Sequence, residues 1–213
     1  MNYIRNIITL VVLGTLISLG SFSFTSTEIN KQSGKLLEIA KEYKKYTVQV
    51  DRSSSFKWTV AACMAPLITK ADSMHFSKAN PKKSPHGNKL YKFFVKDLHS
   101  YTDPSVKTQP VGQVLVKETW NVKEISGGES ASTEKLVAKK SKNDGKWYSP
   151  TTVSELFIMY KEKKNKNNDE GWVYGVVSLE KPDVSSAVLA KGKISTCIGC
   201  HAGTKYDRMF GKN

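Results

Sequence analysis

The residues with the clearest chemical meaning form the motif Cys197-Ile198-Gly199-Cys200-His201, near the end of the 213-residue sequence. A Cys-x-x-Cys-His motif is typical of c-type haem attachment, in which each thiol adds to a haem vinyl group. The histidine beside the second thiol then serves as an axial ligand of the iron. The motif therefore predicts one covalently attached haem c, with Cys197 and Cys200 as tethers and His201 as the iron ligand.

Two other uses of paired cysteines are less consistent with this sequence. A redox dithiol is expected at the start of a thioredoxin-like βαβ unit, and the motif here lies late in the chain. A zinc site needs four ligands, and three cysteines and four histidines supply no second paired cluster. Because only twelve residues follow His201, we expect the side chains over the far face of the haem to come from upstream.

The first 24 residues resemble a secretory signal. Arg5 precedes an apolar run from Ile7 to Leu19, and small residues such as Ser21 and Ser23 follow it. An uncleaved anchor is the alternative, because residues 7–24 come close to the shortest length that spans a bilayer. Either alternative exports the folded part to the periplasm, where c-type haem is attached in bacteria.

The chain is strongly basic, with a net charge of +14. Nucleic acid is a poor explanation in an exported protein, so the charge favours an anionic redox partner, an anionic membrane surface or simple solubility. Lysine-rich runs at 139–142 and 161–166 are typical of solvated loops. Cys63 has no cysteine left to pair with and lies in an apolar stretch, which predicts a buried small hydrophobe. A haem-facing thiol and an intermolecular bridge are the alternatives.

The elements that must position these residues follow from hydrophobic spacing. An α-helix is predicted over 36–46, and a long loop over 126–147. Strands are predicted over 56–61, 90–95, 113–122, 156–161 and 172–177. Residues 156–177 should form a hairpin around a polar turn at 165–171. The prediction is an antiparallel, β-rich α+β domain with an N-terminal helix and a C-terminal haem-binding helix. Its segments are the signal at 1–24, a helix and first strand at 25–83, and the haem domain at 84–213.

Five sequence blocks between Ser84 and Gly211 resemble the cytochrome P-460 family and its relative, cytochrome c′-beta. The blocks are Pro85–Tyr91, Pro110–Glu118, Gly171–Gly175, Ser195–His201 and Tyr206–Gly211. The resemblance implies a β-rich domain closed by a C-terminal haem motif. It also implies a five-coordinate iron that binds or oxidises small nitrogen compounds such as hydroxylamine or nitric oxide. The family is often dimeric, so a homodimer is an open alternative.

The resemblance assigns two further residues. Lys117 matches the family's lysine that bonds covalently to the haem macrocycle, and Glu155 resembles its distal carboxylate, which would accept protons. Lys117 is already unusual, because an unpaired lysine in a buried strand is costly; the alternative is a lysine on a solvent-facing side. Cytochrome c′-beta lacks the crosslink, so a non-enzymatic protein that binds nitric oxide or transfers electrons is the second function class.

The distal side of the iron is the least determined part of the predicted site. Phe93, Phe94 and Phe157 are candidates for an apolar cap. A six-coordinate electron carrier with a methionine as the sixth ligand is a third alternative, and histidines are further candidates for a distal ligand. The candidates for that ligand are Met64, Met74, Met159, His75, His86 and His99. His86, in a Pro-His-Gly turn, is expected instead to donate or accept a hydrogen bond near the site.

Overall fold

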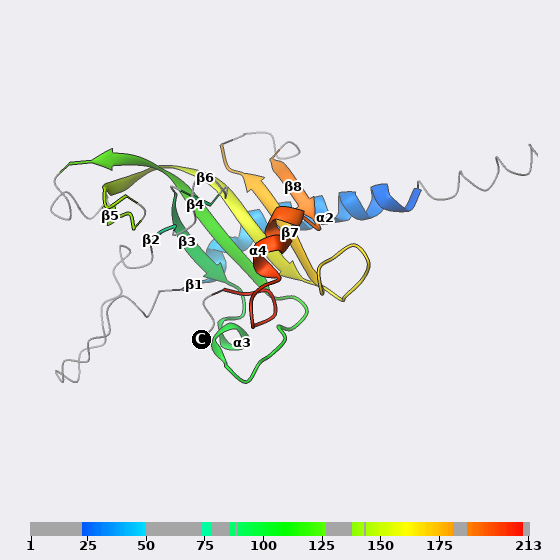
Figure 1. Cartoon of the computed structure of the whole chain (residues 1–213). Coiled ribbons are helices and arrows are strands. Elements are labelled where there is room, and N and C mark those ends of the chain that lie inside the picture. Colours follow the sequence, from blue (N-terminus) through cyan, green and yellow to red (C-terminus); the bar gives the residue numbers. More distant parts are fainter. Residues whose placement is uncertain are drawn as a thin grey trace, which may run out of the picture.

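A computed structural model describes residues 23–49, 74–77, 86–87, 89–126, 138–142, 144–180 and 187–210. These residues form one sheet of eight strands, every pair antiparallel, with helices on both faces (Figure 1). The helical elements are α2 (Ser23–Glu42), the 3-10 helix η1 (Tyr43–Lys45), α3 (Leu98–Thr102) and α4 (Ser195–His201). The strands are β1 (Thr47–Gln49), β2 (His75–Phe76), β3 (Leu90–Val95), β4 (Val114–Ile125), β5 (Lys139–Lys140), β6 (Trp147–Lys161), β7 (Trp172–Ser178) and β8 (Val188–Gly192).

The sheet is built around the long strands β4 and β6. Its main path runs β1-β3-β4-β6-β7-β8, while β2 pairs with β3 and β5 pairs with β6. The register places Lys117 of β4 between Phe93 of β3 and Phe157 of β6. Because side chains alternate between the faces of a sheet, these three residues share one face. Their chain neighbours Phe94, Val116 and Ile158 lie on the other.

The face that carries Phe94, Val116 and Ile158 is closed by α2, which lies behind the sheet in Figure 1. Leu36 and Ile39 of the helix are fully buried against β-strand residues such as Val116 and Ile158. The helix comes so close to β7 that a Cβ at Gly175 would collide with the side chain of Leu36. Glycine at this position therefore permits the close packing of the helix on the sheet.

The face that carries Phe93, Lys117 and Phe157, called the second face below, is covered in part by α4 and the segment after it, which lie in front of the sheet in Figure 1. Here Leu115, Met159, Trp172 and Tyr174 form a second buried cluster, against which Cys197 of α4 packs. The motif helix therefore sits on the face that also presents Lys117.

The predicted fold class is confirmed, and several boundaries need correction. The strands predicted at 90–95 and 172–177 are β3 and β7, and the predicted hairpin around the polar turn is β6–β7. The strand predicted at 156–161 begins at Trp147 instead, because its first half pairs with the far end of β4 and with β5. Part of the predicted loop at 126–147 is therefore β5. The predicted helix at 36–46 is the second half of a longer α2, followed by η1.

Lys161 is a further correction. It was assigned to a solvated lysine run, yet its side chain is 6% exposed, and it forms an ion pair with Asp207. The run at 161–166 becomes solvent-exposed only from Lys163 onward.

Some expectations fall outside the part of the chain that the structure describes. These are the strand at 56–61, Cys63, Met64 and the signal segment apart from its last two residues, which begin α2. Among the described helices, none is long and apolar enough to cross a bilayer.

Candidate functional site

The motif helix α4 presents its two cysteines differently. Cys197 is half-buried against the second cluster, and burial raises the pKa of its thiol. Cys200 is exposed. Residues three apart share one side of a helix, so both thiols are presented from the same side of α4. Among the described residues, no group of three or more His, Cys, Asp and Glu could hold a bare metal ion.

His201, the last residue of α4, is held in a defined orientation. Its Nδ1 lies 2.5 Å from the backbone carbonyl oxygen of Arg208. A carbonyl oxygen only accepts, so Nδ1 carries the proton and donates it, which leaves the lone pair on Nε2. The rings of Tyr174 and Phe210 flank the imidazole, with centroids 5.5 and 4.8 Å away. Burial lowers the pKa of His201, which favours the neutral form that a metal ligand needs.

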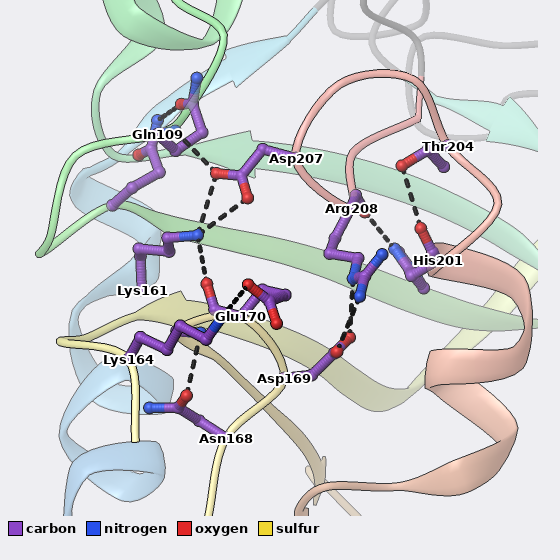
Figure 2. Close-up of polar contacts among 12 residues, drawn as sticks. Gln109, Lys161, Lys164, Asn168, Asp169, Glu170, His201, Thr204, Asp207 and Arg208 are labelled. Carbon is purple, nitrogen blue, oxygen red and sulfur yellow. Dashed lines mark hydrogen bonds and ion pairs between the residues drawn. The ribbon is translucent and has the colours of Figure 1, made fainter. Parts of the chain in front are cut away.

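The backbone that accepts this hydrogen bond belongs to a network of charges (Figure 2). The Arg208 guanidinium binds both carboxylate oxygens of Asp169, at 2.9 and 3.0 Å, and Tyr174 donates to the same carboxylate at 2.9 Å. Burial opposes ionisation of Asp169, but these hydrogen bonds from Arg208 and Tyr174 outweigh it and lower its pKa. Beside this group, Lys161 binds Asp207 at 2.9 and 3.0 Å.

Lys117 stands in the middle of the second face. Its side chain is half-buried, and its Nζ lies 4.1 Å from the centre of the Tyr91 ring. Burial, reinforced by the charge of Lys89, lowers the pKa of Lys117 to about 8. The amine therefore has a neutral fraction near neutral pH that an exposed lysine lacks. Lys117 therefore lies on the face of β4 opposite α2, where its side chain is partly rather than fully exposed.

Glu155 lies two residues from Phe157 on β6, within the strand rather than at its start as predicted. Lys89 binds its carboxylate at 2.6 Å, and both side chains keep partial solvent access, with 26% of Glu155 exposed. A salt bridge thus occupies the carboxylate that was predicted to accept protons.

His86 joins the two halves of the site. Its ring lies 4.1 Å from that of Phe157. Burial, together with the nearby charges of Lys117 and His201, lowers the pKa of His86 to about 3. The imidazole is therefore neutral at physiological pH.

The other candidate ligands are distributed unevenly. Met159 is buried in the second cluster and Met74 is also buried, as packing residues usually are. His75 is half-buried beside Tyr91, with ring centroids 5.5 Å apart, while His99 on α3 is exposed. Phe94 faces α2 on the opposite side of the sheet, so it is excluded as a distal cap.

The second face fits a large flat cofactor. Tyr91, Phe93, Lys117 and Phe157 are all only half-buried at mid-sheet, where the opposite face is closed by α2. Cofactor sites are lined mainly by apolar and aromatic side chains with a few polar groups, which is the composition of this surface. Trp172 of the same cluster has a buried indole Nε1 without a hydrogen-bond acceptor among the described residues. A buried donor of this kind usually has a partner, and a polar group of a bound cofactor could supply one.

Sequence reasoning missed the residues that support the site. Lys89, Asp169, Asp207 and Arg208 carry no recognisable motif, and their roles arise from contacts across 39 to 66 residues of sequence. Lys89, Asp207 and Arg208 stand inside blocks that carried the family resemblance, and Asp169 lies two residues before one. That resemblance was the only available signal.

A comparison with family models finds the cytochrome P-460 family over residues 41–210, which is most of the chain. No curated protein matches the chain in a sequence comparison. The matched segment contains the whole sheet, Lys117, Glu155 and the Cys-x-x-Cys-His motif. The chain therefore belongs to the cytochrome P-460 family, whose members are haem proteins.

Proposed function

We propose that this protein is an exported c-type cytochrome with one haem, which binds or oxidises small nitrogen compounds at an open iron position. The observation that carries the proposal is the hydrogen bond from His201 Nδ1 to the Arg208 carbonyl, 2.5 Å long. It leaves Nε2 as the nitrogen available to a metal, on the face that presents Lys117, Phe157 and His86.

In this proposal, Cys197 and Cys200 hold the haem through thioether bonds. Each thiol adds across one vinyl group, so that sulfur bonds to one carbon, the hydrogen goes to the other, and no electrons are lost. The group would lie on the half-buried surface around Phe93 and Phe157. When bound, it supplies a redox-active iron whose remaining coordination position takes the ligand.

Lys117 is proposed as the third tether. Its lowered pKa keeps part of the amine neutral and nucleophilic at neutral pH. Replacing a ring C–H bond by a C–N bond removes two hydrogens, so the reaction needs a two-electron oxidant of the peroxide class. The amine would thereby lose the charge that makes it costly at mid-sheet.

Glu155 is the proposed proton acceptor for the oxidising activity. Oxidation of hydroxylamine to nitric or nitrous oxide releases one proton for each electron removed. The protons need an acceptor at the site, and the electrons need an external one-electron carrier. The net positive charge of the chain suits an anionic carrier protein.

The salt bridge between Lys89 and Glu155 favours the second candidate function. The Lys89 ammonium, 2.6 Å from the Glu155 carboxylate, occupies the group that would otherwise meet the substrate. If Lys89 stays bound to Glu155 during turnover, the protein binds nitric oxide or passes electrons without oxidising hydroxylamine. That function matches the cytochrome c′-beta type.

Mass spectrometry of the protease-digested holoprotein tests the attachment chemistry. We expect one haem per chain on the peptide that holds Cys197 and Cys200, and the same haem joined to the peptide that holds Lys117. A Lys117→Arg variant should keep the first attachment and lose the second. Haem on the cysteine peptide alone in the natural chain contradicts the crosslink, and haem-free peptides contradict the whole proposal.

A steady-state assay separates the two candidate functions. Hydroxylamine with a one-electron dye acceptor should be consumed by the natural chain and much more slowly by Glu155→Gln. Equal rates in both proteins exclude Glu155 as the proton acceptor. Tight nitric oxide binding without dye reduction assigns the protein to the second function.

Fractionation of producing cells tests export, which predicts haem protein in the periplasm or on the outer side of the inner membrane.

A further inference from the structure

The segment after α4 turns back so that the carbonyl of Arg208 meets the imidazole of His201, seven residues earlier. This return requires an unusual backbone. Asp207 and Arg208 have φ angles of 43° and 66°, in the left-handed region that residues other than glycine rarely adopt. Two consecutive residues in this region are unfavourable unless other contacts hold them there.

Arg208 supplies the first of these contacts. Its guanidinium pairs with both oxygens of Asp169, and it also donates to the carbonyl of Ala202 at 3.2 Å. Asp169 is itself fixed, because its backbone exchanges two hydrogen bonds of 2.8 Å with Trp172. Its side chain is 9% exposed and also accepts from Tyr174. The arginine fork therefore connects the returning segment to the rigid start of β7 (Figure 2).

Asp207 supplies the second contact. It pairs with Lys161 at the end of β6, and the two side chains are 9% and 6% exposed. The backbone N–H of Gln109 donates to the same carboxylate at 2.7 Å. Both left-handed residues are thus held by ion pairs: the Asp207 pair is nearly buried, and the Arg208 pair has a buried carboxylate and a guanidinium that is 23% exposed. The two ion pairs thus oppose the cost of the left-handed backbone at Asp207 and Arg208.

We propose that the Arg208–Asp169 pair is a proximal clamp, a pair of positioning residues that fixes the carbonyl accepting from His201 and so sets the basicity of its Nε2. This inference rests on the proposed function, because it concerns the iron ligand named there. A firmly held acceptor makes an imidazole a stronger donor to a metal and stabilises the oxidised metal. Substitution of the Arg208 side chain leaves the backbone carbonyl itself unchanged, so an effect on His201 arises either from the position of that carbonyl or from the lost guanidinium charge.

The reduction potential of the haem in the purified holoprotein tests the clamp. Arg208→Gln removes the ion pair with Asp169 but keeps an unbranched polar side chain at position 208. We expect the preference of the site for oxidised over reduced iron to fall about tenfold, which raises the potential by about 59 mV. The iron–histidine stretching band in the Raman spectrum of the reduced protein should shift to lower frequency. Glu170→Gln is the matched control, because it breaks the exposed Lys164–Glu170 pair in the neighbouring turn.

A second variant separates position from charge. Arg208→Asn also removes the guanidinium, but asparagine tolerates a left-handed backbone. It should recover at least half of the potential shift seen in Arg208→Gln. A shift as large as that of Arg208→Gln contradicts positioning through the backbone. If Arg208→Gln gives no holoprotein, Asp169→Asn replaces it in the same comparison.

The outcomes also separate this inference from the proposed function. A natural chain without covalent haem contradicts the proposed function and leaves no iron to position. A natural chain with haem, and a potential and Raman band that are the same in Arg208→Gln and Glu170→Gln, overturns the clamp alone.

Discussion

Glu118 offers a stability prediction that is independent of haem chemistry. It follows Lys117 on β4, so its side chain points to the opposite face, where it is fully buried under η1. Its carboxylate accepts from the Tyr43 hydroxyl at 2.5 Å and from the Trp120 indole at 2.9 Å, and it pairs with Lys44. We predict that Glu118→Gln lowers the free energy of unfolding without changing the haem spectrum.

The contacts of Glu118 set the size of this effect. The Lys44 side chain is 58% exposed, so its ion pair contributes at most about 1 kcal/mol. The Tyr43 hydroxyl and the Trp120 indole donate to different oxygens of the carboxylate, and an amide keeps only one acceptor oxygen. One charge-assisted hydrogen bond therefore becomes neutral and the other must be reversed or lost, at a cost of about 1 kcal/mol each. The sum is about 2–3 kcal/mol. For a domain of this size it corresponds to a fall of roughly 4–12 °C in Tm.

Chemical denaturation followed by circular dichroism measures this loss, and Glu124→Gln is the matched control. Glu124 lies on the same strand and pairs with Lys146, but both of those side chains are more than half exposed. Its substitution should cost about 0.5 kcal/mol or less. If Glu118→Gln and Glu124→Gln lose the same stability, the buried cluster around Glu118 does not anchor η1 to the sheet, and the reasoning is refuted.

Three more predictions concern packing, pH and the distal salt bridge. Gly175→Ala should cost about 1–3 kcal/mol of unfolding free energy because its Cβ would collide with Leu36, whereas Gly34→Ala, in the exposed middle of α2, should gain up to about 1 kcal/mol; a neutral Gly175→Ala would contradict the close packing of α2. Burial raises the pKa of Tyr101 to about 12, above its value of about 10 in the unfolded chain. The folded state therefore holds the hydroxyl proton of Tyr101 more tightly than the unfolded chain does. The contribution of Tyr101 to the free energy of unfolding is complete below about pH 10 and is lost as the pH rises towards 12. Unfolding free energies at pH 9 and 11 should differ less in Tyr101→Phe than in the natural chain, and an unchanged difference would exclude Tyr101 as a source. Lys89→Met should free Glu155 and raise hydroxylamine turnover severalfold, while Lys92→Met on β3 should not; slower turnover in Lys89→Met would mean that the ammonium assists the reaction.

The sequence predicted the elements whose signals are local. Short runs of aromatic and β-branched residues at 90–95 and 172–177 identified β3 and β7, because such residues favour a pleated surface packed on both sides. The first half of β6 escaped prediction, since Pro150, Thr151 and Thr152 break the apolar alternation and the pairing there depends on β4 and β5. The short strands β1, β2 and β5 are too brief to leave a pattern.

The site divides in the same way. Cys197, Cys200 and His201 are identified by the spacing of the Cys-x-x-Cys-His motif, and Lys117 by its charge in an apolar strand. The residues that act on them are separated in sequence: Asp169 meets Arg208 across 39 residues, and Lys89 meets Glu155 across 66. Nothing local marks such a pair, because a charged residue in a turn usually faces water. Only the fold shows which of these charges is buried and which partner it has.

The two faces of β4 explain why a lysine persists at mid-sheet. On the α2 face, Val114, Val116 and Glu118 are all buried, so any change there alters stability. On the other face, Lys117 lies between half-buried Phe93 and Phe157, with no helix over it among the described residues. An apolar residue at 117 would pack as well and would avoid the desolvation that lowers the pKa of the amine. Desolvation of the amine is unfavourable for the fold, its contact with the Tyr91 ring opposes that cost, and a group bound on that face would oppose it further. Lys117→Met should accordingly be neutral or stabilising before haem attachment, and a large loss of stability at that stage would show that the lysine serves the fold instead.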